Sequence, residues 1–293
     1  MNQKYIGFLF TIAIIAVSFA AVFVKWSEAP ATVSSMYRMY LSSVLLLPFV
    51  WRHRSAVKRI SKREWGFLAL AGICLAIHFA LWFGSLKLTT VASSTIILAL
   101  QPIVALVGGF LVYRERVKLS VLITILFSIS GAVLIGWGDF GHGSQAAILG
   151  DVLSFLSVIA VVGYLLVGQN NVRQMPHWIY SFTVFLFAGI ALNFYNLAAG
   201  IPVTGYDGRE WGIFLLLAIF PSLSHVIFNY LLAYVNTTAI SMSILGEPVG
   251  ATILAVIFLG EQIRPVQLAG GVIVLFGVFL FLMRSQRQRV EKR

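Results

Sequence analysis

The sequence has few charged residues. Charged side chains make up 11% of the 293 residues and apolar side chains 59%, whereas a soluble domain carries about 25% charged residues. So few polar groups cannot cover the surface of a fold that faces water, and we expect a lipid bilayer to surround most of the chain. The composition therefore excludes a soluble regulator.

The sequence also lacks features that several other classes of protein need. Cys74 is the lone cysteine, which excludes an internal disulfide. The longest polar stretch, 52–64, is too short for a soluble domain, and no GxxxxGK[ST] pattern occurs, so a P-loop-driven pump is not expected. No nucleophile paired with a base and no set of residues at metal-ligand spacing stands out. We predict no catalytic residues, no metal and no cofactor, and an intramembrane enzyme acting on lipid is the least favoured class.

The net charge of +11 lies in short segments and at the C-terminal end. With the N-terminus in the cytoplasm, sixteen Lys and Arg fall on cytoplasmic segments and four on external ones. The positive-inside rule then predicts a multi-pass protein of the cell membrane with both termini in the cytoplasm and a basic tail at 285–293. Charge placed in this way favours an anionic lipid surface, and we expect no nucleic-acid partner.

Apolar runs of about 20 residues, each long enough to cross roughly 30 Å of hydrocarbon, recur along the whole chain. They fall at about 5–24, 31–50, 65–84, 91–113, 120–138, 148–168, 178–199, 211–232, 238–260 and 267–283. The sequence therefore predicts an all-α integral membrane protein with ten transmembrane helices.

Two stretches, 101–137 and 247–283, match each other at an offset of 146 residues. The matching pairs are Gln101 and Glu247, Pro102 and Pro248, Glu115 and Glu261, Lys118 and Arg264, and Gly131 and Gly277. We infer an internal duplication, with a first repeat at 1–140 and a second at 147–284. Because each repeat holds five spans, the second enters the membrane with opposite orientation. Inverted five-helix repeats are typical of secondary transporters; the alternative is a duplication that only gives a stable helical bundle.

The ninth predicted span has an acid beside a proline near its middle. A charge at this depth costs about 2.5–3.5 kcal/mol on insertion scales, and Pro248 removes a backbone donor next to Glu247. Gln101 and Pro102 repeat the arrangement in the fourth span. Transporter sites are often built at such helix breaks. Glu247 is predicted to bind a cationic group or to take up a proton; the alternative is a structural ion pair or hydrogen bond.

Other polar side chains on the predicted spans are candidates for the same site. Arg38, next to Tyr37, either snorkels to the outer interface, pairs with Glu247, or binds a substrate carboxylate. His78 and Trp82 share a helix face, as do His225 and Asn229. These pairs are predicted to line a polar cavity or to join helices by hydrogen bonds. The weaker candidates, for which helix bridging is the alternative, include Tyr164 and Tyr234.

A family resemblance is carried by Gly246-Glu247-Pro248-Val249 and by the Phe-Leu-Gly-Glu at 258–261, with Gln101-Pro102-Ile103 as the partner copy. These motifs resemble the EamA repeat of the drug/metabolite transporter (DMT) superfamily over essentially the whole chain. The resemblance implies ten helices in two halves around a central cavity, and substrates such as amino acids, metabolites, drugs or quaternary amines, often exported. Gln101 departs from the pattern, since the first copy has no acid, and this argues against symmetric carboxylate coupling.

From these features we expect a secondary transporter that binds a small-molecule substrate in a lipid bilayer. The first interpretation is export of amino acids or related metabolites by alternating access, with protons as the candidate exchanged ion. One alternative is uptake of a quaternary amine such as choline, for which Trp82 and the tyrosines would offer ring faces and Glu247 a counter-charge. The alternative of a different class is a non-transporting membrane sensor or partner protein. Monomer and homodimer are both open.

Overall fold

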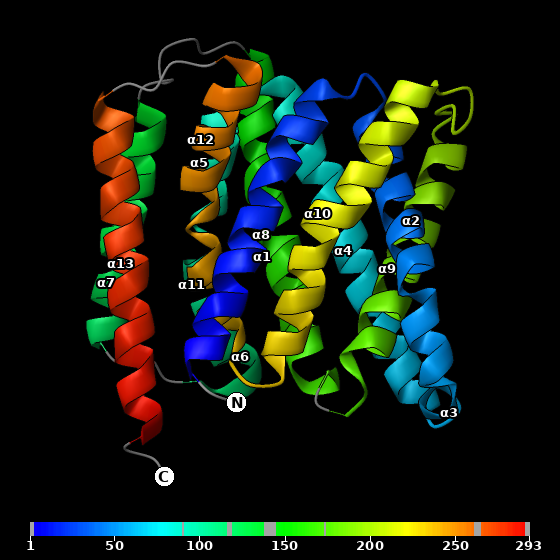
Figure 1. Cartoon of the computed structure of the whole chain (residues 1–293), viewed down its shortest axis with the longest axis horizontal. Coiled ribbons are helices and arrows are strands. Elements are labelled where there is room, and N and C mark those ends of the chain that lie inside the picture. Colours follow the sequence, from blue (N-terminus) through cyan, green and yellow to red (C-terminus); the bar gives the residue numbers. More distant parts are fainter. Residues whose placement is uncertain are drawn as a thin grey trace.

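The computed structural model describes residues 3–89, 91–115, 119–137, 145–172, 174–260 and 265–290, and the regular structure within these ranges is helical. These ranges contain thirteen helices, which Figure 1 labels. They are α1 (Gln3–Trp26), α2 (Ala31–Arg52), α3 (Arg54–Val57), α4 (Lys62–Leu88), α5 (Val91–Leu98), α6 (Gln101–Tyr113), α7 (Leu119–Trp137), α8 (Gln145–Asn171), α9 (His177–Ala198), α10 (Gly208–Leu232), α11 (Thr237–Ile244), α12 (Glu247–Leu259) and α13 (Pro265–Val290).

Seven helical stretches in the described chain are long and apolar enough to cross a membrane, with α11 and α12 taken together as one of them. Three shorter apolar helices, Gln101–Tyr113, Leu119–Leu134 and Leu268–Phe281, lie among them. The all-helical membrane class agrees with the sequence, and the count of ten spans stays a prediction. The segment predicted as a basic tail begins inside α13, which continues to Val290.

The fourth and ninth predicted spans are each divided into an eight-residue and a thirteen-residue helix. The breaks precede Gln101 in one case and Glu247 in the other, so that Pro102 and Pro248 stand in the first turn of the second helix, where a missing N–H leaves no carbonyl unpaired. Both thirteen-residue helices end in a left-handed residue, Arg114 with φ 56° and Gly260 with φ 70°. The 146-residue offset of the sequence therefore reappears in the backbone. Glu261, Lys118 and Arg264, three members of the matching pairs, lie outside the described residues.

Helices α7 and α13 run in opposite directions side by side at one edge of the bundle (Figure 1). They cross at equivalent glycines: a Cβ on Gly131 would lie 2.7 Å from the Gly270 carbonyl oxygen, and a Cβ on Gly277 would meet Ser128. Small residues at such crossings let helix backbones approach closely in lipid. The two glycines therefore explain why this pair of helices packs along its length.

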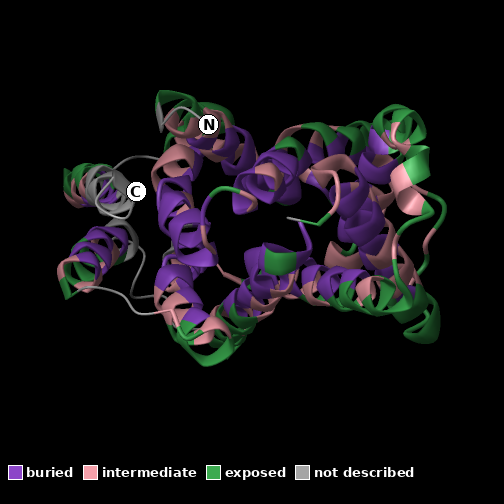
Figure 2. Ribbon diagram, turned by 90° about the horizontal axis from the view of Figure 1, so that it is seen from below, coloured by how far each residue is buried: buried purple, intermediate pink, exposed green. Residues whose placement is uncertain are grey.

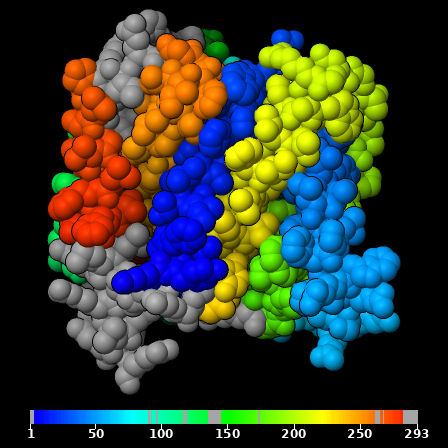
Figure 3. Space-filling view, viewed as in Figure 1, coloured from blue at the N-terminus to red at the C-terminus, as the bar shows by residue number. Residues whose placement is uncertain are grey.

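The remaining helices form the main body of the bundle. Helix α1 lies between α10 and α12, as the space-filling view of Figure 3 shows, while α4 packs along α8 and α2 along α9. Buried residues face the interior and exposed residues the outside (Figure 2). Large apolar side chains such as Phe194 and Leu119, both 70% exposed, stand on that outer surface. An apolar outside is what a hydrocarbon solvent requires.

Candidate functional site

Arg38 lies in the middle of the bundle with no exposed surface. Its Nε donates a hydrogen bond to the Ser222 Oγ at 3.2 Å, and its Cζ lies 4.0 Å from the centroid of the Phe79 ring. Nη1 and Nη2 have no hydrogen-bond partner in the described part of the chain. The interpretation that Arg38 snorkels to the interface is wrong, because the side chain is enclosed by α4 and α10.

The acceptor for Arg38 is itself held in place. The Ser42 Oγ, one helical turn after Arg38, donates to the Arg38 carbonyl oxygen at 2.5 Å and lies 2.7 Å from the Ser222 Oγ. Ser222 thus joins α10 to α2, and the guanidinium is fixed on one edge by a hydroxyl and on one face by a ring. An arginine restrained in this way presents its two terminal nitrogens in a constant direction.

Glu247 is the first residue of α12, at the break after α11, and is 3% exposed. Its Oε1 has no hydrogen-bond partner among the described residues. The charges of Arg38 and Glu247 act on each other, but the described chain contains no ion pair between them within 4.0 Å. The structural ion pair considered from the sequence is therefore not formed as a direct contact.

Two histidines and an indole lie beside Arg38. His78 stacks on Trp82 with ring centroids 5.9 Å apart, as their four-residue spacing predicts. The His78 Nδ1 is 3.0 Å from the Ser157 carbonyl oxygen, so that nitrogen carries the proton and donates. His225 contacts the Phe79 ring edge-on at 5.2 Å, and the Arg38 charge acts on both histidines.

We call this group of buried side chains the central cluster. Its members come from α2, α4, α10 and α12 and are Arg38, His78, Phe79, Trp82, His225 and Glu247. The Trp82 Nε1 and the His225 Nδ1 have no hydrogen-bond partner within the described ranges. The cluster therefore brings together opposite charges, ring faces and several unpartnered polar atoms in the buried interior of the bundle.

A chain of hydrogen bonds lies next to the cluster. The Tyr164 hydroxyl donates to the Asn229 Oδ1, and the Asn229 Nδ2 donates to the Ser181 Oγ at 3.1 Å, so that α8, α10 and α9 are joined. Gln101 donates through Nε2 to the Ser241 Oγ at 3.1 Å and joins α6 to α11. Asn229 and Gln101 thus bond to neighbouring helices, and Tyr164, whose ring centroid lies 6.1 Å from that of His225, borders the cluster.

The remaining two candidates lie away from the cluster. Tyr37 donates its hydroxyl to the Val203 carbonyl oxygen at 2.5 Å and stacks on Phe214 at 4.9 Å, near the start of α10. Tyr234 is 38% exposed and packs edge-on against Tyr230, just after α10 ends. Tyr37 therefore lies outside the central cluster although it is next to Arg38 in the sequence.

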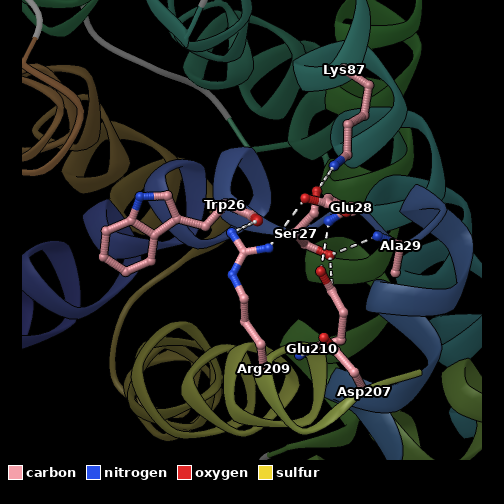
Figure 4. A network of polar contacts seen from close by, with 8 residues as sticks. All are labelled: Trp26, Ser27, Glu28, Ala29, Lys87, Asp207, Arg209 and Glu210. Carbon is pink, nitrogen blue, oxygen red and sulfur yellow. Dashed lines mark hydrogen bonds and ion pairs between the residues drawn. The ribbon is translucent and has the colours of Figure 1, made fainter.

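One end of the bundle is joined by a network around Glu210, shown in Figure 4. Its Oε2 accepts from the Ser27 Oγ at 2.6 Å and its Oε1 from the Glu28 backbone N–H at 2.7 Å. Lys87 donates to the Ser27 carbonyl oxygen, and Arg209 pairs with the exposed Glu28 carboxylate at 3.3 Å. These five residues, the elbow network, connect the turn between α1 and α2 with the end of α4 and the start of α10.

The opposite end of the bundle has its own carboxylate-centred network. Glu115 accepts from the Gln169 Nε2 at 2.8 Å and from the Asn236 Nδ2 at 3.0 Å. The Gln169 Oε1 in turn accepts from the Thr237 N–H and hydroxyl, both at 2.7 Å. We call these four residues the base network; they join the ends of α6 and α8 to the start of α11.

Several of these residues are absent from the sequence-based candidates. Ser42 and Ser222 each had a usable signal, since Ser42 is one turn from Arg38 and Ser222 is three residues before His225 on the same face. Glu210 had none, because its partners in the turn after α1 are more than 180 residues away in the chain. Only the packing of α10 against α1 brings them together.

The family of the chain is given by its match to a family model. The model of the EamA-like transporter family matches residues 4–137 and again 148–283. The chain belongs to this family. With its long apolar helices, this EamA-like chain is a multi-pass membrane protein of a transporter family.

Relatives of the EamA-like chain match most of its length. An uncharacterized transporter of Archaeoglobus fulgidus is 27% identical over 288 residues, which cover 96% of this chain and 98% of the relative. The uncharacterized transporter YwfM of Bacillus subtilis is 24% identical over 264 residues, covering 87% and 86%. A crystal structure of another protein matches with a TM-score of 0.80 at 16% identity, over 98% of this chain and 99% of that one, and shows the shared fold alone.

Proposed function

We propose that this EamA-like chain is a secondary transporter of small organic metabolites, with amino acids or related compounds as the first substrate class. It works by alternating access as an exporter in the cell membrane, through ten spans in two inverted repeats. The observation that carries the proposal is the central cluster, in which Arg38 and Glu247 are buried from different halves of the chain and each keeps an unpartnered polar atom. A bundle built only for stability gains nothing from such atoms, because each buried unpaired polar group costs about 1–3 kcal/mol.

The two end networks support an alternating mechanism. The elbow network ties together α1, α2, α4 and α10, and the base network ties together α6, α8 and α11. Hydrogen bonds between side chains at helix ends are cheap to exchange for water, since each contributes about 1 kcal/mol net. Opening one network at a time exposes the central cluster to one side at a time, which is the requirement for transport without a leak.

Glu247 is proposed as the group that exchanges protons. It begins α12 at a helix break, where its carboxylate has one oxygen without a partner in the described chain. Protonation removes the cost of a buried charge, and deprotonation restores attraction to Arg38. A group with two such states couples proton movement to substrate movement.

With both termini in the cytoplasm, the elbow network faces the outside.

Counterflow in proteoliposomes tests the proposal. Purified protein is reconstituted into vesicles loaded with an unlabelled amino acid, and uptake of the same labelled compound is followed against protein-free vesicles. We expect transient accumulation for at least one amino acid or related metabolite. The non-transporting sensor predicts no counterflow with any substrate and a partner protein on pull-down, and that result would replace the present proposal.

Uptake of a quaternary amine is the second candidate from the sequence, and the geometry disfavours it. One face of the Phe79 ring is already covered by the Arg38 guanidinium, whose Cζ lies 4.0 Å from the ring centroid. A substrate with only a positive charge would also enter the field of Arg38 without a local anion other than Glu247 among the described cluster residues. Choline therefore serves as the negative comparison in the same counterflow assay.

A further inference from the structure

The unpartnered nitrogens of Arg38 point to the chemical class of the substrate. A guanidinium has five N–H donors, and here Nε alone has an acceptor, the Ser222 Oγ. Nη1 and Nη2 are buried and have no hydrogen-bond partner in the portion of the chain that the structure describes. Leaving charged donors unpaired in a dry interior costs more than leaving neutral ones.

The guanidinium is held so that these two nitrogens act together. Ser42 fixes Ser222, Ser222 fixes Nε, and the Phe79 ring supports one face of the group. The free edge then presents two parallel N–H donors, the geometry that a carboxylate fills with two hydrogen bonds. A protonated amine offers no acceptor, and an amide offers one neutral oxygen in place of the two charged oxygens that match the paired donors.

Glu247 limits which anion fits. Its carboxylate is buried in the same bundle as Arg38, and no direct ion pair within 4.0 Å joins the two in the described chain. A second negative charge on the ligand would be repelled by Glu247, while an amino group would be attracted to its free Oε1. One guanidinium and one carboxylate, both buried and not paired directly with each other, therefore match a molecule that carries one charge of each sign.

We propose that the Nη1 and Nη2 atoms of Arg38 form the carboxylate-binding position of the transport site, and that the substrate is a zwitterionic amino acid. This rests on the proposed function and narrows it, because it excludes quaternary amines, amino-acid amides and dicarboxylates without an amino group. His78, Trp82 and His225 then surround the rest of the molecule with ring faces.

A binding experiment on the purified full-length protein tests this without any transport step. Thermal unfolding is measured with each standard L-amino acid at millimolar concentration, with the matched amides L-leucinamide and L-phenylalaninamide, with succinate and with choline. Binding to the folded state raises the midpoint of unfolding. We expect one or more amino acids to stabilise, and the amides, succinate and choline to leave the midpoint unchanged. Equal effects of amino acids and amides, stabilisation by choline alone, or no effect of any amino acid would each overturn the assignment.

Variants locate the effect on Arg38. Arg38→Lys keeps the charge but loses the paired donors, and we expect affinity for the stabilising amino acid to fall at least about tenfold. Arg63→Lys is the matched control, since Arg63 also lies over a ring, that of Phe67 at 5.6 Å, but at the exposed start of α4. Unchanged affinity in Arg38→Lys would contradict the proposal. Amino-acid binding without counterflow would instead leave the binding position standing and refute transport.

Discussion

Arg38 and Glu247 show what a single residue does in this protein. Each carries a charge into the middle of a membrane bundle, and each is surrounded by helices from different parts of the chain. The sequence predicted that both matter, because charges are expensive in hydrocarbon. The sequence did not predict that the two side chains form no direct ion pair, or that Ser222 accepts from Arg38. Both depend on how α2, α10 and α12 are rotated about their axes, and residue spacing does not specify this rotation.

Proton exchange at Glu247 would make transport depend on the pH difference across the membrane. If Glu247 exchanges protons, vesicles with an acidic lumen will accumulate labelled amino acid, because protons leaving the lumen drive substrate in. Glu247→Gln cannot exchange a proton, so accumulation is expected to fall to the level seen without a pH gradient. Glu64→Gln is the control, since Glu64 is a partly exposed capping residue at the start of α4. Full pH-driven accumulation by Glu247→Gln would show that another group couples transport.

The hydrogen-bond chain beside the cluster is expected to contribute to the stability of the fold. Tyr164→Phe leaves the Asn229 Oδ1 without its donor in a fully buried position, and we expect a loss of about 1–2 kcal/mol in the free energy of unfolding. Tyr206→Phe removes a hydroxyl that donates to the Pro202 carbonyl in an exposed loop, and should change stability by less than about 0.5 kcal/mol. Thermal or denaturant unfolding in detergent measures both. Equal losses would mean that the buried chain has no special weight.

At the scale of helices, the sequence predicted most where backbone chemistry decides the outcome. Proline beside Gln101 and Glu247 predicted a weakened turn in two spans, and both spans are divided there. The prediction was poorer for side chains whose depth depends on tilt, as Tyr37 and Tyr234 show. It failed for Glu210, because its network joins segments that meet only after the whole bundle has formed.

The crossing of α7 and α13 gives a matched pair of substitutions. A methyl group on Gly131 meets backbone atoms of α13, the Gly270 oxygen at 2.7 Å and the Val274 nitrogen at 2.8 Å, whereas on Gly277 it meets first the Ser128 hydroxyl, which can rotate. Gly131→Ala is expected to destabilise by about 1–3 kcal/mol and Gly277→Ala by less. Gly7→Ala, with open space around it, is the neutral control. Unfolding midpoints that rank Gly277→Ala as the more damaging change would contradict this packing.

The elbow network is expected to hold the turn after α1 in place. Glu210→Gln keeps the size of the side chain but replaces one accepting oxygen by an NH₂ group, which only donates, so the side chain can no longer accept from both the Ser27 hydroxyl and the Glu28 N–H. We expect faster hydrogen exchange in 26–30 at the turn after α1. Glu28→Gln alters only an exposed ion pair, worth about 0–1 kcal/mol, and should leave exchange there unchanged. Similar exchange in wild type and Glu210→Gln would mean that other contacts hold this end.

The molecule as a whole repeats itself, in sequence and in backbone, at one offset of 146 residues. Equivalent broken helices, equivalent left-handed caps and equivalent glycines at the α7–α13 crossing recur in the two halves that the family model matches. The site is less symmetric than the backbone, since Gln101 stands where the second half has Glu247. A symmetric frame with one acid suits two similar conformations that share a single coupling group.

The central claim is that the elbow end opens during each cycle, and a reversible cross-link tests it most directly. Glu28→Cys and Arg209→Cys, an exposed pair in the elbow network, are combined in a Cys74→Ser background and joined by a cleavable bifunctional thiol reagent in proteoliposomes. The account predicts that amino-acid counterflow stops on cross-linking and returns when the linker is cleaved, while each single cysteine variant is unaffected by the reagent. Counterflow at the full rate with the elbow cross-linked would contradict it.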